Sequence, residues 1–495
     1  MDEIILQDVS FHYNESKTAS LSHINLNIPE GKVVVLCGES GCGKSTVIRL
    51  INGLIPFYYH GELEGKVLVQ GHEVEKGTIY DLGSRVSTVF QNPRSQFYCV
   101  DVESELAFGA ENLNMPKEEI RSRIEKITHA LRMEKLLGRT MFQLSGGEKQ
   151  KIACACVSVT DNPVIVLDEP SSNLDRNAIE ELKEVLKFWK RQGKTIVIAE
   201  HRLHYLKGIA DSYVYLKNGE IKEEFSHERF EKFSTSELNA MGLRSIRYDE
   251  LKIQNKNCSQ SSLELHDFSF TYRRAKTPSL SIRELQLPEN AVIAVIGQNG
   301  AGKSTFIRNF CGLEKKGKGV LKSGDSILKA KQRLNSSFLV MQDVNHQLFT
   351  ESVLDEIALS AKDFEKTKFE ELLTAFDLAD LKDRHPMSLS GGQKQRVAVA
   401  SAIASNRRFI AFDEPTSGLD YLHMKQVAGC IMDLQKMNKT IFLITHDLEL
   451  IYSCCNYVLY IKDGRAEELY EMREENMEKH KYFKRNYGNH LCSEI

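Results

Sequence analysis

The sequence lacks several features that would assign it to a special class. It has no apolar run of about 18 residues, so no segment is expected to cross a membrane as a helix. The first ten residues, MDEIILQDVS, are acidic and carry too short an apolar stretch for a signal peptide. Proline accounts for only 10 of 495 residues, which is too few for a linker-rich or disordered chain.

No charge of one sign predominates. The chain has 65 Lys and Arg against 68 Asp and Glu, a formal net charge of −3. This balance argues against a protein whose main task is to hold nucleic acid phosphates. The 41% apolar and 27% charged residues are ordinary for a globular protein, and the length allows two large domains or about three smaller ones.

Cysteine does not form a recognisable framework. The 11 cysteines are odd in number and scattered, without a CxxC pair or a Cys/His cluster at zinc spacing. We therefore expect buried, reduced thiols in a cytosolic protein.

What the sequence does contain is an internal repeat. Three stretches of the first half return 245 positions later: LSGGEKQK (144–151) as LSGGQKQR, VLDEPSSNLD (166–175) as AFDEPTSGLD, and His201 as His446. GESGCGKST (38–46) returns as GQNGAGKST 259 positions later, so the second copy has lost 14 residues between its first and second motifs. One domain has been duplicated.

The boundaries follow from composition. We predict a first domain over residues 2–240, a linker over 241–262, a second domain over 263–480 and a charged tail over 481–495. The polar stretch NKNCSQSS (255–262) is the best linker candidate. Residues after about 466 are charged and helical by composition, which predicts a solvated helix with a frayed end.

Each half alternates short apolar runs with helical periods. Runs such as KVVVLC, VIVL and TIVIA are typical of buried parallel strands. Between two of them, a helical face is predicted, and Gly193 should end that helix. The pattern predicts an α/β domain with a doubly wound parallel sheet. The residues expected on the buried helical face are Ile179, Leu182, Val185, Leu186 and Trp189.

Both copies contain the pattern G-x-x-x-x-G-K-[ST], each time directly after an apolar run. Glycines let consecutive backbone N–H groups surround a phosphate, and the helix that follows presents its N-terminus to the anion. Lys44 and Lys303 can reach the outer phosphates of a nucleotide. The residues predicted to bind ATP are Gly38, Glu39, Ser40, Gly41, Cys42, Gly43, Lys44, Ser45 and Thr46, with Gly297, Gln298, Asn299, Gly300, Ala301, Gly302, Lys303, Ser304 and Thr305 in the second copy.

A pair of carboxylates follows the run VIVL and its repeat. Asp168 and Asp413 are predicted to hold Mg²⁺ together with the hydroxyls of Ser45 and Ser304. The neighbouring residues Glu169 and Glu414 are predicted to polarise the attacking water. The alternative is that these carboxylates cap helices.

The LSGG motif offers a hydroxyl and two amides at a helix start, which is a second anion site. A domain with two phosphate-binding surfaces suggests that nucleotide is held between the loop of one copy and the serine–glycine surface of the other. The residues concerned are Ser145, Gly146 and Gly147 in the first copy and Ser390, Gly391 and Gly392 in the second.

This order of motifs resembles the ATP-binding-cassette ATPases over nearly the whole chain. The resemblance implies a P-loop NTPase core with a parallel sheet, an antiparallel β subdomain and a helical subdomain, duplicated in tandem, and a head-to-tail dimer formed within one molecule. It implies catalytic or Mg²⁺-binding roles for Gln91 and Gln342, and a γ-phosphate contact from His201 and His446. Tyr13 and Tyr272 match the aromatic that stacks on adenine, although Tyr13 could instead be a core residue and His201 a structural one.

A narrower resemblance rests on the segments QNPRSQFYCVDVESELAF and QDVNHQLFTESVLDEIAL. Both resemble the ATPases of energy-coupling factor importers, in which Gln96 and Gln347 belong to an extra turn. This implies a peripheral protein on the cytoplasmic face of the membrane, with a transmembrane coupling subunit and a separate substrate-binding membrane protein as partners, importing a vitamin or a metal ion. Six acidic residues are expected to meet basic helices of the partner: Asp101, Glu103, Glu105, Glu351, Asp355 and Glu356.

Two alternatives stay open. One is a twin-cassette sugar-importer ATPase, and the other is a non-transport ATPase that acts on ribosomes or DNA. The copies also differ, with Asn173 against Gly418 and Glu200 against Thr445, but no catalytic group is missing. We therefore expect both sites to hydrolyse ATP.

Overall fold

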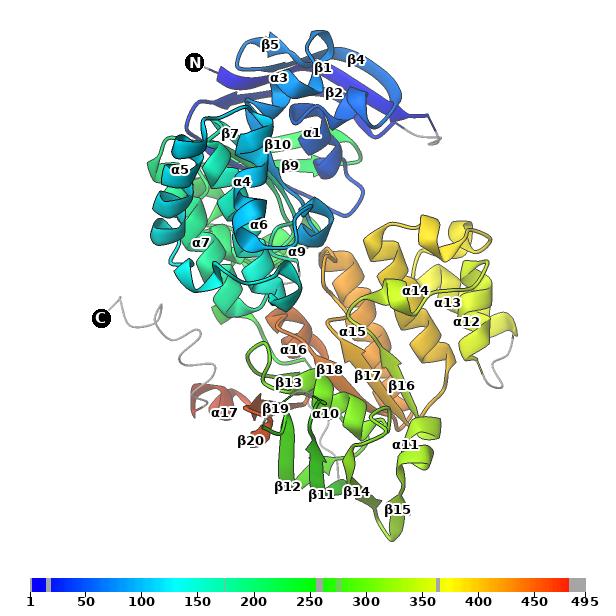
Figure 1. Cartoon of the computed structure of the whole chain (residues 1–495). Helices are drawn as coiled ribbons and strands as arrows, with labels where there is room; N and C mark the ends of the chain where they lie inside the picture. Colours follow the sequence, from blue (N-terminus) through cyan, green and yellow to red (C-terminus); the bar gives the residue numbers. More distant parts are fainter. Residues whose placement is uncertain are drawn as a thin grey trace. The chain divides into compact units, whose positions relative to one another are not determined.

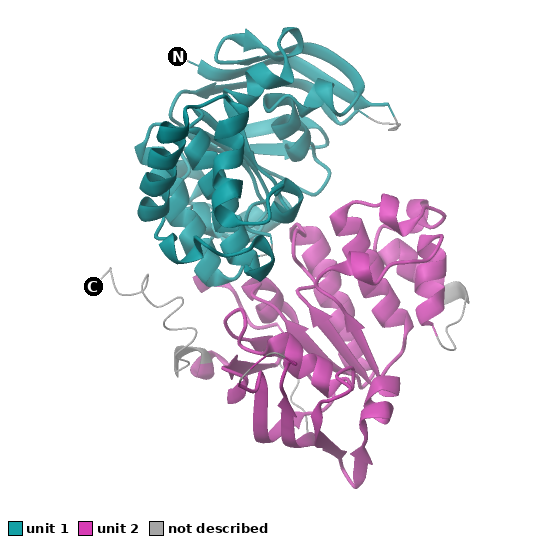
Figure 2. Ribbon diagram, viewed as in Figure 1, with its two compact units in different colours: residues 1–247 teal, residues 248–495 magenta. Residues whose placement is uncertain are grey.

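The computed structural model describes residues 2–14, 19–172, 174–254, 261–273, 275, 277–361 and 366–479. The chain divides into two compact units, residues 1–247 and 248–495 (Figure 2). Each unit is described by itself. Asn173, residues 255–260 of the expected linker and the whole expected tail 481–495 lie outside the described residues.

The core of unit 1 is a six-stranded sheet in the order β10-β9-β3-β8-β7-β6 (Figure 1). The strands pair in parallel from β9 to β6, and β10 is antiparallel to β9. Every residue of β3 and β8 is buried, as the continuous apolar runs predict. The bounds are β3 (Val33–Cys37), β6 (Val86–Val89), β7 (Val164–Asp168), β8 (Thr195–Ala199), β9 (Ser212–Lys217) and β10 (Glu220–Ser226).

A second, antiparallel sheet in the order β2-β1-β4-β5 shares one hydrophobic core with the first sheet. Its strands are β1 (Asp2–Tyr13), β2 (Leu21–Pro29), β4 (Gly61–Val69) and β5 (His72–Glu73). Three helices accompany these strands: α1 (Lys44–Ile51), α2 (Leu54–Phe57) and α3 (Ile79–Gly83). This is the expected antiparallel β subdomain.

The remaining helices of unit 1 pack on the other face of the core sheet. In α7 the buried residues are the five predicted ones, and the helix ends at Arg191, two residues before Gly193. The prediction of this helical face is confirmed. The bounds are α4 (Val102–Asn112), α5 (Lys117–Ala130), α6 (Gly146–Thr160), α7 (Arg176–Arg191), α8 (His227–Phe230) and α9 (Thr235–Ala240).

Unit 2 repeats this plan. Its core sheet has the order β16-β17-β18-β13-β19-β20, and its antiparallel sheet the order β12-β11-β14-β15. The strands are β11 (Ser262–Phe270), β12 (Leu280–Pro288), β13 (Val292–Ile296), β14 (Lys318–Ser323), β15 (Ser326–Leu328), β16 (Ser337–Val340), β17 (Phe409–Asp413), β18 (Thr440–Ile444), β19 (Tyr457–Lys462) and β20 (Arg465–Glu471). The helices are α10 (Lys303–Phe310), α11 (Ala330–Ser336), α12 (Val353–Ser360), α13 (Lys366–Ala375), α14 (Gly391–Ala404), α15 (Tyr421–Lys436), α16 (Leu448–Cys454) and α17 (Glu474–Lys479).

The expectation of a helix from about residue 466 is wrong for its first part. Residues up to Glu471 form β20, which pairs antiparallel with β19 and places Tyr457 opposite Glu471. In the described part of this segment, which ends at residue 479, α17 is the only helix. Pairing with a formed sheet edge overrides the helical composition of ELYE, because strand formation depends on neighbours that composition does not report.

Candidate active sites

The phosphate-binding loop of each unit joins a buried strand to a helix: β3 to α1 and β13 to α10. Gly38 has φ 151°, and a Cβ placed there would lie 2.2 Å from the carbonyl oxygen of Leu216. Gly297 has φ 152° and stands in the same relation to Ile461. No other residue fits, so the strand next to β3 or β13 fixes the start of the loop.

The loop lysines are buried and held by the loop itself. Lys44 Nζ donates to the carbonyl oxygens of Gly38 and Glu39, both at 2.9 Å, and lies 3.7 Å from Cys42 Sγ. Lys303 Nζ donates to the first two carbonyls of its own loop at 2.8 and 3.0 Å. Each ammonium group is therefore positioned inside the loop that a phosphate would occupy.

A serine hydroxyl and an aspartate carboxylate meet beside each loop. Ser45 Oγ donates to Asp168 at 2.9 Å, and Ser304 Oγ donates to Asp413 at 2.8 Å. Burial, followed by the charge of Glu169, raises the pKa of Asp168 to about 6, and burial also raises that of Asp413.

These oxygens fit Mg²⁺, which binds through one or two protein oxygens and nucleotide phosphates. Among the described residues no three His, Cys, Asp or Glu side chains could hold a metal by themselves. The Ser–Asp pair therefore suits a metal that arrives with a nucleotide, and does not form a cage of its own.

Glu169 is held on both sides in unit 1. Gln91 Nε2 donates to it at 2.7 Å, and His201 Nε2 lies 3.4 Å from its other oxygen. Burial acts to raise the pKa of Glu169, but the hydrogen bond and charge of His201 together with Gln91 outweigh it, so the pKa is below its ordinary value. The carboxylate is kept ionised and oriented, as a group that accepts a proton from water must be.

The backbone at this glutamate is strained in the same way in both units. Glu169 has φ 43° and Glu414 has φ 52°, in the left-handed region that non-glycine residues rarely adopt. Each is fixed by a 2.8 Å bond from its N–H to the carbonyl of the adjacent strand, at Ala199 and Ile444. Strain of this kind concentrates at functional sites.

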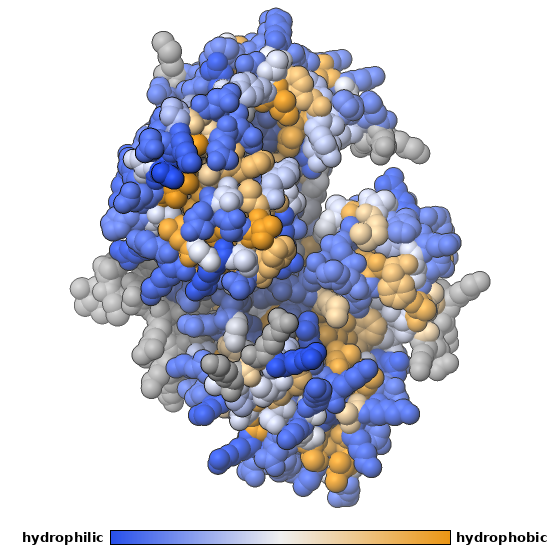
Figure 3. Space-filling view, viewed as in Figure 1, coloured by the Kyte–Doolittle hydropathy of each residue, from blue (hydrophilic) through white to orange (hydrophobic). Residues whose placement is uncertain are grey.

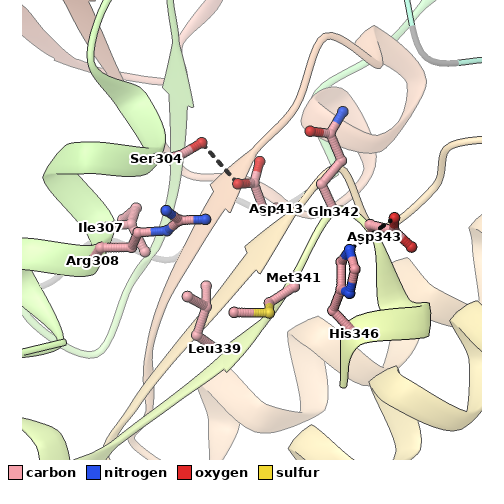
Figure 4. Close-up of a pocket in the computed structure, with 9 residues that line it drawn as sticks. All are labelled: Ser304, Ile307, Arg308, Leu339, Met341, Gln342, Asp343, His346 and Asp413. Atoms are coloured by element: carbon pink, nitrogen blue, oxygen red, sulfur yellow. Dashed lines mark hydrogen bonds and ion pairs between the residues drawn. The ribbon is translucent and has the colours of Figure 1, made fainter. Parts of the chain in front are cut away.

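The glutamate of unit 2 has different partners. His446 Nε2 lies 3.8 Å from Glu414, and Thr445 Oγ1 donates to it at 3.4 Å. Gln342 lines a cavity of about 380 Å³ together with Ser304 and Asp413 (Figure 4). The residues predicted to act in hydrolysis are present in both units, but their contacts differ.

Sequence reasoning predicted three of the nine residues that line this cavity and missed six, among them Arg308 and His346. Figure 4 shows Arg308 from α10 pointing into the cavity, with His346 on its opposite wall. Arg308 could have been found, because it stands four positions after Ser304 and therefore lies on the same helix face. His346 follows Gln342 by four residues but lies in a short 3₁₀ turn that the sequence did not predict.

The residue before each histidine, Glu200 in unit 1 and Thr445 in unit 2, also forms different contacts in the two units. Glu200 is 2% exposed and accepts hydrogen bonds from the N–H groups of Ser171 and His201 and from the Tyr205 hydroxyl at 3.3, 2.7 and 2.9 Å. It also accepts from the N–H of Arg202 at 3.0 Å. The carboxylate therefore fixes the loop that carries His201.

The signature serines begin helices. Ser145 caps α6 and Ser390 caps α14, each as half of a capping box with the third residue of the helix, Glu148 or Gln393. Gly146, Gly147, Gly391 and Gly392 form the first turns, and both serines are exposed. The serine–glycine surface thus faces away from the unit's own core, which leaves it accessible to a ligand.

Tyr13 and Tyr272 lie beside the phosphate-binding loops. Their hydroxyls are 3.4 and 3.1 Å from the hydroxyls of Thr46 and Thr305, and Tyr272 is 43% exposed. Arg49 also donates to the Tyr13 hydroxyl at 2.8 Å. Both rings are placed at the loop, and their stacking on adenine stays a prediction.

Two of the acidic residues expected to meet a partner are instead internal. Glu105 and Glu356 are each 4% exposed, and each accepts hydrogen bonds from two consecutive backbone N–H groups of the preceding loop. The expectation is wrong for these two residues. Their burial depends on how α4 and α12 pack on α6 and α14, which charge patterning does not report.

The two sheets, the phosphate-binding loops and the carboxylate pairs define a tandem ATPase of the P-loop class. The sequence model of the ABC transporter family matches residues 21–172 and 280–417, which is more than half of the chain. The chain therefore belongs to the ABC transporter family, as a protein with two ATP-binding domains that hydrolyses ATP.

Relatives match along nearly the whole chain. A protein of Treponema denticola is 43% identical over 93% of this chain and 96% of its own length. One from Methanosarcina mazei is 30% identical over 93% of this chain and 87% of its own. Both carry the provisional description of an ABC transporter ATP-binding protein.

Solved structures agree in fold. An archaeal ribosome recycling factor, solved with a ribosomal stalk protein, matches with a TM-score of 0.64 and 20% identity over 95% of this chain and 92% of that one. This likeness shows the shared tandem fold. Over the described residues, no helix is long and apolar enough to cross a membrane.

Proposed function

We propose that the chain is the ATPase subunit of an energy-coupling factor importer for a vitamin or a metal ion. It would work at the cytoplasmic face of the membrane with a transmembrane coupling subunit and a separate substrate-binding membrane protein. The descriptions of the relatives support a transport role. The observation that carries the proposal is an exposed apolar patch in each unit, formed by residues that follow Gln91 or Gln342 and residues just before the LSGG motif.

We define the docking patch as Tyr98, Val100 and Phe142 in unit 1, and Phe349 and Met387 in unit 2. The exposed fractions are 76%, 60% and 83% in unit 1, and 72% and 49% in unit 2. Figure 3 shows hydrophobic residues gathered over the helical part of each unit. Exposed apolar groups of this kind mark interaction sites.

Backbone contacts hold the parts of the patch together. In unit 1 the N–H of Met141, next to Phe142, donates to the carbonyl of Val100 at 2.8 Å, and the Tyr98 ring stacks on Phe108 with centroids 5.1 Å apart. In unit 1 these contacts hold the patch as a formed surface. A rigid apolar surface is suited to a helix of a membrane protein that reaches into the cytoplasm.

For the chemistry, we propose that the loop lysines and glycines hold the phosphates of ATP. Mg²⁺, when bound through Ser45 with Asp168 or Ser304 with Asp413, would neutralise charge that builds on the phosphates. Gln91 and His201 hold Glu169 so that its carboxylate can accept the proton of the attacking water, and Glu414 does the same in unit 2.

We further propose that the binding site for each nucleotide is completed by residues of the other unit. The exposed Ser145–Gly147 turn would meet the phosphates held at Lys303, and the Ser390–Gly392 turn those held at Lys44. Each helix start offers free N–H groups to an anion. ATP binding would close the pair of units and hydrolysis would reopen it, since the γ-phosphate is the group that differs between the two states.

Affinity purification from solubilised membranes tests the transport role. The tagged chain is expected to co-elute with membrane proteins, and Tyr98→Ser with Phe349→Ser should remove most of them while leaving the melting temperature unchanged. The control pair Tyr80→Ser and Ile327→Ser removes apolar groups of similar exposure, 56% and 55%, elsewhere on each unit.

Two outcomes would contradict the proposal. One is retention of all membrane partners by the patch variant. The other is co-sedimentation of the chain with ribosomes in place of membrane proteins, which would favour the non-transport alternative.

A further inference from the structure

The turn after each catalytic glutamine is closed by a second glutamine. Gln96 Oε1 accepts from the N–H of Phe90 at 3.3 Å, while its Nε2 donates to the carbonyl of Thr88 at 3.1 Å. The carboxamide of Gln96 thus uses one donor and one acceptor to bond to the end of β6. A neighbouring strand would bond to this edge through the same two kinds of backbone group.

Unit 2 contains the same arrangement with different neighbours. Gln347 Oε1 accepts from the N–H of Met341 at 3.1 Å, and its Nε2 donates to the carbonyl of Leu339 at 3.2 Å, at the end of β16. The residues between the two glutamines of each turn differ almost completely, NPRS against DVNH. Both turns nevertheless close in the same way, so the closure depends on the glutamine itself.

A buried carboxylate fastens the far side of each turn. Glu105 accepts from the N–H groups of Tyr98 and Cys99 at 3.0 and 2.7 Å. Glu356 accepts from those of Phe349 and Thr350 at 2.9 and 3.0 Å. Charged acceptors form the stronger hydrogen bonds, and both carboxylates are buried. The turn is therefore attached at one end to the core sheet and at the other end to α4 or α12.

The turn joins two functional features of unit 1. Phe90, held by Gln96, directly precedes Gln91, whose amide donates to Glu169 at 2.7 Å. At the other end, Tyr98 presents its exposed ring to solvent. A rigid segment of a few residues thus connects the hydrolytic carboxylate to the docking patch.

We infer that Gln96 and Gln347 are positioning residues that set the location of Gln91 and Gln342. The inference rests on the proposed role of Gln91 and Gln342 in hydrolysis, and it extends the proposed function by assigning the residues that hold these two glutamines in place.

The test uses the purified full-length chain without a membrane partner. Gln96→Ala with Gln347→Ala is expected to lower kcat for ATP about tenfold, since small misplacements of a catalytic group carry large rate costs. KM for ATP and the melting temperature should stay close to wild type, because the described hydrogen bonds of the Gln96 and Gln347 side chains go to the ends of β6 and β16 and not to the phosphate-binding loop. Gln192→Ala, an exposed glutamine at the end of α7, serves as the control and should leave kcat unchanged.

A double-mutant comparison separates positioning from a general structural role. In a Gln91→Ala, Gln342→Ala background, removal of Gln96 and Gln347 should lower kcat less than twofold further, because residues that act as one unit are not additive. Unchanged kcat in the first variant would overturn the inference. A full additional tenfold loss in the second, or a loss of kcat that follows a lowered melting temperature, would overturn it as well.

A second variant covers the case in which the alanine variant fails to fold. Gln96→Glu with Gln347→Glu keeps the side-chain size and the acceptor but removes the donor to the Thr88 and Leu339 carbonyls, and the same loss of kcat is expected. Both measurements are made without a partner. Failure of the importer proposal would appear only in the membrane purification, whereas failure of this inference would appear in the kinetics.

Discussion

At the scale of single residues, the two units hold His201 and His446, the histidines predicted to contact the γ-phosphate, by different means. Glu200 accepts three hydrogen bonds from residues of the loop that carries His201 and a fourth from the N–H of Ser171, which follows β7. In unit 2 the Thr416 hydroxyl donates to Asp447 at 2.7 Å, and Thr445 contacts Glu414 directly. The first unit therefore stabilises the loop through one buried charge, and the second through a chain of hydroxyls and an aspartate.

The first prediction concerns that buried charge. Glu200→Gln should lower the free energy of unfolding of unit 1 by about 2–3 kcal/mol, because an amide nitrogen then faces backbone donors in a buried site. Denaturant titration checks this through Trp189, which is the single tryptophan of the chain and is buried in α7 of the same unit. Thr445→Val, which removes one hydroxyl in unit 2, is the matched control and should leave the tryptophan transition in place. An unchanged midpoint for Glu200→Gln would contradict the stabilising role.

The second prediction concerns the hydrolytic carboxylates. Glu169→Gln and Glu414→Gln should each lower steady-state ATP turnover by at least half, and the double variant should lose about 100-fold or more, because general-base catalysis contributes about 10²–10⁴. Phosphate release by the purified chain measures this. Full turnover in either single variant would show that its site is silent.

How far the site could be predicted depends on how local each feature is. The loop lysines and serines, the aspartates after the apolar runs and the capping serines each belong to a motif whose residues sit within a few positions of one another. Each Ser–Asp pair joins two such motifs, which are 123 and 109 positions apart in the two units. The positive φ of Glu169 and Glu414 has no sequence signal, since it arises from pairing of their N–H groups with the adjacent strand. The roles of Glu105 and Glu356 were wrongly predicted because burial of a carboxylate depends on the packing of helices distant in sequence.

At the scale of elements, the α/β class and the buried parallel strands were predictable from continuous apolar runs, and the buried face of α7 from its period. The final strand was not. The segment of β20 has a polar, helix-like composition and becomes a strand because β19 presents an open edge beside it. Such edges are properties of the assembled sheet, so they are read only from the structure.

The third prediction tests the helix starts. Ser145→Ala should lower the free energy of unfolding by about 1 kcal/mol, because the capping box at the N-terminus of α6 loses its side-chain acceptor. Ser145→Gly is the matched control and should cost only a few tenths of a kcal/mol, since glycine adopts the cap conformation without an acceptor. Fluorescence of Trp189 during denaturation measures both. Unchanged stability of the Ser145→Ala variant would show that the cap hydrogen bond contributes nothing.

At the scale of the whole molecule, the sequence repeat becomes two units that each contain a phosphate-binding loop, a Ser–Asp pair and a glutamate predicted to act on one ATP. Each unit also exposes a signature turn that its own catalytic cluster does not contact through the described hydrogen bonds. A chain that carries two loops and two signature turns can use them within units or between them. Pairing within units would make the duplicated chain two independent ATPases, whereas pairing between units would make it one ATPase with two shared sites.

Paired substitutions distinguish these arrangements, and they form the fourth prediction. If the sites are shared, Lys44→Ala with Ser390→Arg damages one site twice and leaves the site of Lys303 and Ser145 intact, so one ATP per chain should still be held tightly. Lys44→Ala with Ser145→Arg damages both sites, so tightly held ATP and turnover should both fall to the level of the double lysine variant. Each pair alters one lysine and one serine, which makes them matched controls for each other. If the units are independent, Lys44 and Ser145 belong to one site, so Lys44→Ala with Ser145→Arg would leave one ATP bound and Lys44→Ala with Ser390→Arg would leave none. The number of ATP molecules bound per chain, measured together with turnover, distinguishes shared sites from independent units.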